Sequence, residues 1–281
     1  MSHRVLGFAI CGLAFATLTP IANATAVIGF DAAYTAAGQW YQSDVRPGGS
    51  AAVVSLVGAG GNLESNQPLP TGAARLTTDN TNAAKAEVAV ADAYGKAGNI
   101  LRSLELQYDF YRSNAAGQNT AAAPALKLTF YKPSACIGDC FVTLVYEPYW
   151  QSGSSADPTA NQWTHASIDF DTGLFWQNGG FGQTNSAGGP PLKTLQDWSL
   201  AFNADFAGAD LISVGMGVGT FNPGQNDYFD NVQISHSFGT GYSANYDFGP
   251  AAPAVVPEPS AIALAGLAIL ALAGSRRRKA G

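Results

Sequence analysis

The feature of this sequence that most constrains its fold is a series of short segments in which apolar and polar residues alternate. In the stretch "LELQYDF", every second position is apolar: Leu104, Leu106, Tyr108 and Phe110. Successive side chains of a β-strand point to opposite faces, so this alternation predicts a strand with one buried face. The stretch "LKLTFY" repeats the pattern with Leu126, Leu128 and Phe130.

Similar segments continue along the chain. In "ISVGMGVG", Ile212, Val214, Met216 and Val218 alternate with Ser213, Gly215, Gly217 and Gly219, and in "DYFDNVQI" the alternating set is Tyr228, Asp230, Val232 and Ile234. The stretches "FVTLVYEPYW" and "WTHASIDF" add two more strands, and weaker candidates lie at Ala26–Phe30, Val53–Val57, Ala73–Thr77 and Ala86–Val90. About ten strands with polar outer faces, joined by loops rich in Gly, Pro and Asn, predict an all-β fold of two packed antiparallel sheets.

One segment departs from the period of two. In "LKTLQDWSLAF", Thr194 can cap a helix whose third residue is Asp197. Leu195, Trp198 and Phe202 then share one face of that helix. We expect a short helix on a connection between strands.

The order of these segments over about residues 70–236 resembles a jelly-roll domain of secreted and surface proteins of bacteria, near the concanavalin-like and carbohydrate-binding sandwiches. The resemblance implies a jelly-roll sandwich. It implies no particular activity.

The chain ends in "VPEPSAIALAGLAILALAGSRRRKAG". Its apolar run, residues 261–273, would form a helix of roughly 20 Å, short of the roughly 30 Å of a bilayer core. Pro257, Glu258 and Pro259 precede the run and a basic cluster, Arg276–Lys279, follows it. This order resembles the PEP-CTERM sorting signal of Gram-negative bacteria, and a short tail anchor is the alternative. The resemblance implies transient retention in the inner membrane, cleavage near the motif by an exosortase-type transpeptidase, and sorting to the cell surface or extracellular matrix.

The beginning of the chain agrees with export. Arg4 is followed by an apolar stretch, and small residues at Ala22 and Ala24 predict signal-peptide cleavage before Thr25. The sequence therefore divides into a signal peptide (1–24), a β-sandwich domain (25–248), a Pro/Ala linker (249–256) and a sorting signal (257–281).

The charge and cysteine content of the exported part narrow its function. Between the signal peptide and the sorting signal lie nine of the 14 basic and 19 of the 20 acidic residues. A net charge of about ten negative argues against nucleic acid as a partner. Cys136 and Cys140 are close enough in sequence to form a disulfide outside the cytoplasm, and this ring would contribute on the order of 2 kcal/mol.

Sequence motifs for catalysis are weak, and we predict no catalytic residue and no enzyme activity. Asp171-Thr172-Gly173 matches the tripeptide of aspartic proteases but has no second copy, so a hairpin turn is the simpler interpretation. Glu105 and Asp109 share a strand face without the third carboxylate of jelly-roll glucanases.

Two binding hypotheses remain. Asp31, Asp227 and Asp230 could hold a structural calcium ion between the first and last strands, as carbohydrate-binding jelly rolls commonly do. Tyr149, Trp150 and Trp176 could stack on the apolar faces of sugar rings of an extracellular polysaccharide. The function is therefore either a structural or interaction protein of the surface or matrix, or a glycan-binding module with the same destination.

Overall fold

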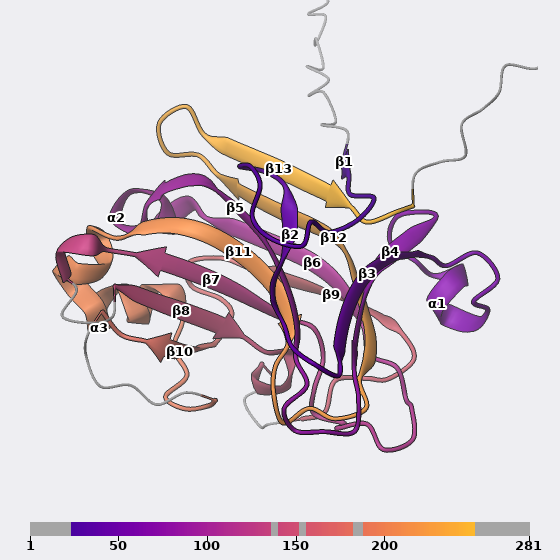
Figure 1. Ribbon diagram of the computed structural model, residues 1–281. Coiled ribbons are helices and arrows are strands. Elements are labelled where there is room, and N and C mark those ends of the chain that lie inside the picture. The colour runs from indigo at the N-terminus through magenta and orange to yellow at the C-terminus, as the bar shows by residue number, and fades with distance from the viewer. Residues whose placement is uncertain (1–23, 136–139, 152–155, 182–187, 251–281) are drawn as a thin grey trace, which may run out of the picture.

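The computed structural model describes residues 24–135, 140–151, 156–181 and 188–250. It is a two-sheet β-sandwich, in which the pairings between strands are antiparallel except for one at the N-terminus (Figure 1). The predicted fold class, a jelly-roll sandwich, is confirmed for these residues. The predicted C-terminal helix lies outside them.

The first sheet has seven strands: β1 (Thr25–Ala26), β3 (Gly49–Ser55), β4 (Gly72–Thr78), β6 (Glu105–Tyr111), β9 (Trp163–Ile168), β12 (Asn226–His236) and β13 (Tyr242–Asp247). The long strand β12 lies at its centre. One edge of β12 pairs with β6, which pairs in turn with β9. The other edge is shared by β4 and β13, which carry β3 and β1 respectively, and β1 runs parallel to β13.

The second sheet has six strands: β2 (Trp40–Val45), β5 (Ala86–Lys96), β7 (Ala125–Tyr131), β8 (Phe141–Tyr146), β10 (Phe175–Gly179) and β11 (Asp210–Val218). Their order across the sheet is β10-β8-β7-β11-β5-β2. Strands from both halves of the chain therefore lie next to one another. Of the five pairings in this sheet, the two made by β11, with β5 and with β7, join the segments that are most distant in sequence.

The core lies between the sheets and contains the apolar faces that the alternation predicts. Leu106 and Tyr108 of β6 are fully buried, as are Leu128 and Phe130 of β7. Burial of each such side chain contributes roughly 1.5–3 kcal/mol, which makes these alternating faces the main drive for the sheets to pack. The prediction for these two strands is confirmed.

In β11 the predicted alternation is wrong at its start. The pairing register shifts between Leu211 and Ser213 on both sides of the strand, which marks a bulge. Leu211 is consequently fully buried in the core, and Ile212 lies on the outer face instead. From Val214 onward the predicted faces are confirmed.

In β12 a second irregularity changes the predicted face. The register with β6 shifts between Asp230 and Gln233, where Asn231 has a φ of 51°. An extra residue at a bulge moves the following side chains to the other face. The core face of β12 therefore consists of Phe229, Val232 and Ile234. The predicted set of even-numbered residues is correct only after the bulge.

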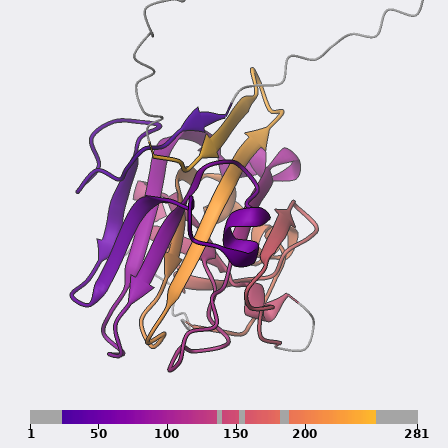
Figure 2. The same cartoon turned by 90° about the vertical axis from the view of Figure 1, so that its right-hand side faces the viewer.

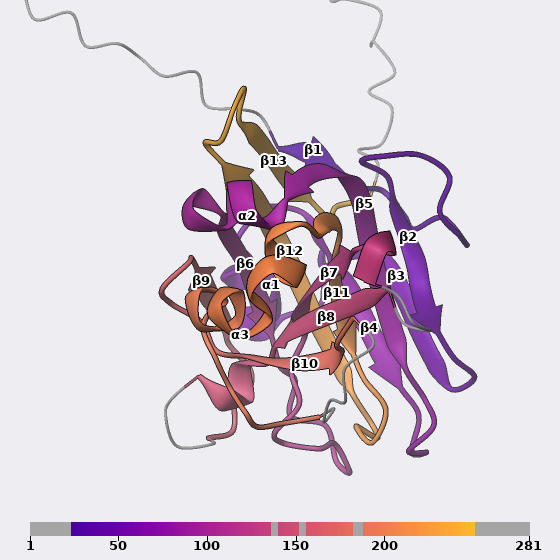
Figure 3. The ribbon, with the colours of Figure 1, turned by 90° about the vertical axis from the view of Figure 1, so that its left-hand side faces the viewer.

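In the part of the chain that the structure describes, three helices and three 3₁₀ turns connect the strands: α1 (Gly61–Ser65), α2 (Ala97–Ile100), α3 (Leu195–Ala207), η1 (Leu101–Ser103), η2 (Pro133–Ala135) and η3 (Pro148–Trp150). The predicted helix is α3. The Thr194 hydroxyl accepts a hydrogen bond from the Asp197 N–H at 3.2 Å, and Leu195, Trp198 and Phe202 are buried. Figure 3 shows α3 beside α2 at one end of the sandwich.

The shorter helix α1 was not predicted. It lies over the outer face of the seven-stranded sheet, as Figure 2 shows. There Leu63 packs against a small cluster that includes Tyr111 and Tyr228, and the Trp163 indole N–H donates to the Leu63 carbonyl oxygen at 3.0 Å.

The segment Asp171–Gly173 is a turn, as predicted, but it is not a hairpin. The Asp169 carboxylate accepts hydrogen bonds from the backbone N–H groups of Asp171 and Thr172, and Gly173 has a φ of 83°. The strands on either side, β9 and β10, belong to different sheets. The turn therefore carries the chain from one sheet to the other.

Candidate functional site

A cleft of about 840 Å³ lies on the outer face of the six-stranded sheet. All six strands contribute residues to it, and the loop residues Asn119 and Asn222 also line it. Its volume is within the range of sites that bind small molecules or short oligomers. Because the cleft crosses the strands, its long axis follows the width of the sheet.

One line of residues crosses the whole cleft. Strand pairing places one residue from each strand in this line, in the order Tyr41, Ala89, Gly215, Lys127, Val145 and Trp176. Five strand spacings give it a length of roughly 24 Å. The line therefore has an aromatic residue at each end and a lysine near its middle.

The floor of the cleft is flat because small residues occupy its centre. Gly215 and Gly217 of β11 lie beside Ala89 of β5 and Ala125 of β7. A Cβ atom at Gly217 would come within 3.2 Å of the Ala86 carbonyl oxygen and closer still to the Glu87 side chain. The glycines thus leave room above the sheet for a ligand and for charged side chains that lie across it.

The three aromatic residues predicted to contact a glycan all line this cleft. Tyr149 and Trp150, on η3, have ring centroids 4.8 Å apart in an edge-to-face arrangement, and Trp176 projects from β10. All three are half-buried, so part of each ring faces solvent. The structure brings them together at one end of the cleft. That they bind a sugar stays a prediction.

Glu147 fixes this aromatic group. Its carboxylate accepts a hydrogen bond from the Trp150 indole N–H at 2.9 Å. Burial raises the pKa of Glu147, and the Trp176 and Trp150 indole N–H groups and the Lys127 charge oppose that rise. The Trp176 N–H lies close enough to affect this carboxylate, but it makes no hydrogen bond of normal geometry to any described residue. Sequence analysis missed Glu147, although its partner Trp150 lies only three residues further along the chain; Trp176 and Lys127 lie on other strands.

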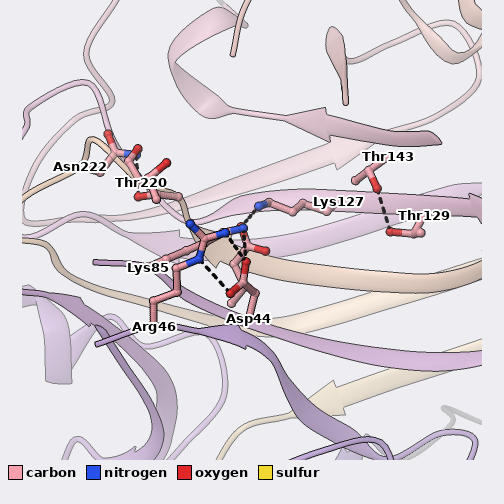
Figure 4. Close-up of polar contacts among 10 residues, drawn as sticks. Asp44, Arg46, Lys85, Lys127, Thr129, Thr143, Thr220 and Asn222 are labelled. Carbon is pink, nitrogen blue, oxygen red and sulfur yellow. Dashed lines mark hydrogen bonds and ion pairs between the residues drawn. The ribbon is translucent and has the colours of Figure 1, made fainter. Parts of the chain in front are cut away.

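A chain of alternating charges runs from the other end of the cleft to its middle (Figure 4). Its members are Arg46, Asp44, Lys85, Glu87 and Lys127, in that order. Arg46 donates two hydrogen bonds to Asp44, at 3.1 and 2.9 Å, and Lys85 lies 2.7 Å from Asp44 and 3.0 Å from Glu87. Lys127 contacts Glu87 from the opposite side.

These contacts set the charge states of the group. The hydrogen bonds from Arg46, with those of Lys85, lower the pKa of Asp44 to about 2 against the opposing effect of burial. Burial and the charge of Lys85 lower the pKa of Lys127. The Glu87 carboxylate in contact with Lys127 favours its ammonium form, so the pair is best described as ionic.

The residues of the calcium hypothesis do not come together. Asp31 is exposed near the N-terminus, whereas Asp227 and Asp230 are fully buried on β12. Within the described residues, no group of three or more Asp, Glu, His or Cys side chains could hold a metal ion. These three aspartates therefore do not form one carboxylate cluster, and calcium binding as such stays a prediction.

The carboxylates considered for catalysis lie elsewhere in the fold. Glu105 is exposed. Asp109 is buried and accepts from Asn231 at 2.8 Å, while its other oxygen lies 3.1 Å from the His165 ring nitrogen. Both are on the seven-stranded sheet, away from the cleft.

Three predicted features fall outside the described residues: the signal peptide, the sorting motif Pro257–Pro259, and Cys136 of the predicted disulfide with Cys140. The disulfide stays a prediction. No helix among the residues that are described has the length and apolar character needed to cross a membrane.

Comparison with known families identifies the sorting motif at the C-terminus. Residues 255–278 match the PEP-CTERM protein-sorting motif. The motif implies that the chain is exported and sorted to the surface, with exosortase as its processing enzyme. The match covers only this terminal segment, and no curated protein matches the chain.

Several solved structures resemble the fold. A family 11 carbohydrate-binding module from Clostridium thermocellum, in complex with a beta-1,3-1,4-mixed-linked tetrasaccharide, has 13% identity and a TM-score of 0.38, over 73% of this chain and 93% of that chain. An endo-beta-1,4-glucuronan lyase from the fungus Trichoderma reesei has 12% identity and a TM-score of 0.38, over 70% and 91%. The mannan-recognising module TmCBM27 has 13% identity and a TM-score of 0.30, over 70% and 88%. These likenesses are too distant to carry an argument about function.

Proposed function

We propose that this protein is a surface-sorted glycan-binding protein that holds an extracellular polysaccharide in the cleft of the six-stranded sheet. The observation that carries the proposal is the line of residues across the cleft, which has aromatic rings at both ends and a floor of glycine and alanine. The sorting motif directs the protein to the cell surface, where extracellular polysaccharides are found.

The chemistry of sugars fits this surface. One face of a pyranose ring presents C–H groups that pack on an aromatic ring, and Trp176 and Tyr41 provide such rings at the two ends. Between them, Thr129, Thr143 and Ser213 line the cleft with hydroxyl groups that can exchange hydrogen bonds with sugar hydroxyls. A cleft of roughly 24 Å suits an oligomer better than a single sugar.

We propose further that the protein acts by non-covalent contact. Glycoside hydrolysis uses two carboxyl groups that flank the scissile bond, one of them able to donate a proton. In the cleft, Asp44 and Glu87 are each held by two cations, and Glu147 accepts from Trp150. These contacts favour a fixed, structural role for the three carboxylates.

The test is binding of the mature protein to a panel of soluble polysaccharides, measured by affinity electrophoresis and calorimetry. Trp176→Ala should weaken binding at least fivefold, since stacking of one ring on an aromatic side chain contributes about 1–3 kcal/mol. Phe238→Ala is the matched control, because Phe238 is an exposed aromatic residue outside the cleft.

Equal binding by wild type and Trp176→Ala would contradict the proposal. The same polymers are then incubated with protein and analysed for chain shortening. Shortening that is lost in Glu147→Gln would show an enzyme in place of a binding protein.

A further inference from the structure

The basic residues of the exported part are distributed unevenly. Nine lie between the predicted signal peptide and the sorting signal, and three of them, Arg46, Lys85 and Lys127, line one half of the cleft. The exported part as a whole has a net charge of about ten negative. Three carboxylates, Asp44, Glu87 and Glu147, also line the cleft, so its lining is neutral overall. The three cations gather in the half away from Glu147, and a local group of cations in an acidic domain favours an anionic ligand at that place over general attraction of anions to the surface.

The charge chain also has donors left over. It begins with Arg46 and ends with Lys127, so its three cations outnumber its two carboxylates. A guanidinium group has five N–H donors, and Arg46 uses two of them on Asp44. Its side chain is 48% exposed, which leaves the other edge of the planar fork accessible. That edge matches a second carboxylate in a bidentate pair.

Lys127 is placed to continue such a contact along the cleft. It lies in the line of six residues between Gly215 and Val145, and its side chain is 17% exposed. Its ammonium group contacts Glu87, whose side chain lies against Gly217, so a ligand would reach Lys127 from above this pair. Of its three ammonium donors, one contacts Glu87. Figure 4 shows Lys127 extending toward Asp44, Arg46 and Lys85, with Thr129 and Thr143 farther along the sheet.

We infer that the cleft selects polysaccharides that carry carboxylate groups, that is, polymers containing uronic acid residues. This inference rests on the proposed glycan-binding function. Sugar rings stack at the end with Trp150 and Trp176, and a sugar carboxylate binds in the other half of the cleft, between Arg46 and the central Lys127. Glu147 at the aromatic end repels a carboxylate there, which gives the bound polymer a preferred position.

The test compares two polymers of the same backbone and length, a polyuronate and its carboxyl-reduced neutral form. Wild-type mature protein should bind the polyuronate at least tenfold more tightly, and that preference should shrink between 50 and 500 mM NaCl as charges are screened. Arg46→Gln should weaken polyuronate binding about tenfold and change binding of the neutral polymer less than twofold. Lys127→Gln should have the same selective effect.

Arg75→Gln is the matched control, because it removes the same charge from an exposed site on the seven-stranded sheet. It should leave both affinities unchanged. Thermal unfolding of each variant shows whether it is folded, and Arg46, being half-exposed, is the variant expected to keep its stability.

The outcomes separate this inference from the proposed function. Equal binding of the two polymers, with no effect of Arg46→Gln but a loss in Trp176→Ala, overturns the carboxylate preference and retains glycan binding. If neither polymer binds wild-type protein, or if Trp176→Ala leaves binding unchanged, both the carboxylate preference and the proposed glycan-binding function are overturned.

Discussion

Two buried aspartates on β12 should make this protein more stable in mild acid than at neutral pH. Asp227 and Asp230 are fully buried, and burial raises the pKa of each from 3.8 to about 7. In Asp227, one carboxyl oxygen accepts from the Ser113 N–H and the Gln118 amide, and in Asp230 one accepts from the Phe248 N–H. The second oxygen of each has no hydrogen-bond partner among the described residues, which suits a protonated carboxyl group.

The sign and size of the effect follow from these shifts. A folded-state pKa above the unfolded value stabilises the protein fully below pH 3.8, and this stabilisation is lost as pH rises through about 7. Between pH 5 and pH 7 each group lowers the free energy of unfolding by about 2 kcal/mol, or about 4–5 kcal/mol for both, because each carboxyl group is still half protonated at pH 7. For a domain of this size the melting temperature should fall by roughly 10–20 °C. Asp44, whose pKa is about 2, loses its contribution only below this window.

The assay is thermal and urea unfolding of the mature protein at pH 5, 6, 7 and 8. Wild type should lose stability steadily up to pH 7. Asp227→Asn and Asp230→Asn replace the carboxyl group with a neutral amide, so each should remove about half of the slope. Asp171→Asn, an exposed turn residue, should leave it unchanged. Stability that stays level or increases from pH 5 to pH 7 in wild type, or a slope in both buried variants that equals the wild-type slope, would refute this reasoning.

Three further predictions concern processing and local structure. Mass spectrometry of protein from native cells should find a C-terminus near Pro257–Pro259, and recovery of intact Arg276–Lys279 on the surface form would contradict it. Non-reducing peptide mapping of exported protein should find Cys136 bonded to Cys140, whereas free thiols at both positions would count against the disulfide. Thr194→Ala should lower the free energy of unfolding by about 1 kcal/mol, because the Asp197 N–H loses its cap; an unchanged urea midpoint would show that the cap is dispensable.

Much of the local structure could be predicted from the sequence. The buried faces of β6 and β7 follow from strict alternation, and the start of α3 follows from Thr194 and Asp197, because strand faces and helix caps depend on residues that are neighbours in sequence. The strands β2, β10 and β13 were missed. In β2 and β10, polar residues share the strand with aromatic ones, and alternation is weak where both faces are partly covered.

For the candidate site, the sequence indicated Tyr149, Trp150 and Trp176 as aromatic residues near two loops, and it showed that Ser213, Gly215 and Gly217 share one face of a strand. It could not show that these two groups belong to one cleft. The short outward side chains of "ISVGMGVG" were a usable signal, since a strand face without bulk is typical of a place where something else approaches.

The sequence by itself determined the alternating strands, the capped helix and the sorting signal, since each is written in residues that are close along the chain. Only the tertiary structure decided that Tyr41 and Trp176 end the same line across a sheet and that Arg46, Lys85 and Lys127 meet in one half of the cleft. Strand order and register are set by how distant faces pack together, and bulges such as the one after Leu211 change the face locally. A cleft that crosses six strands exists only once all six are paired.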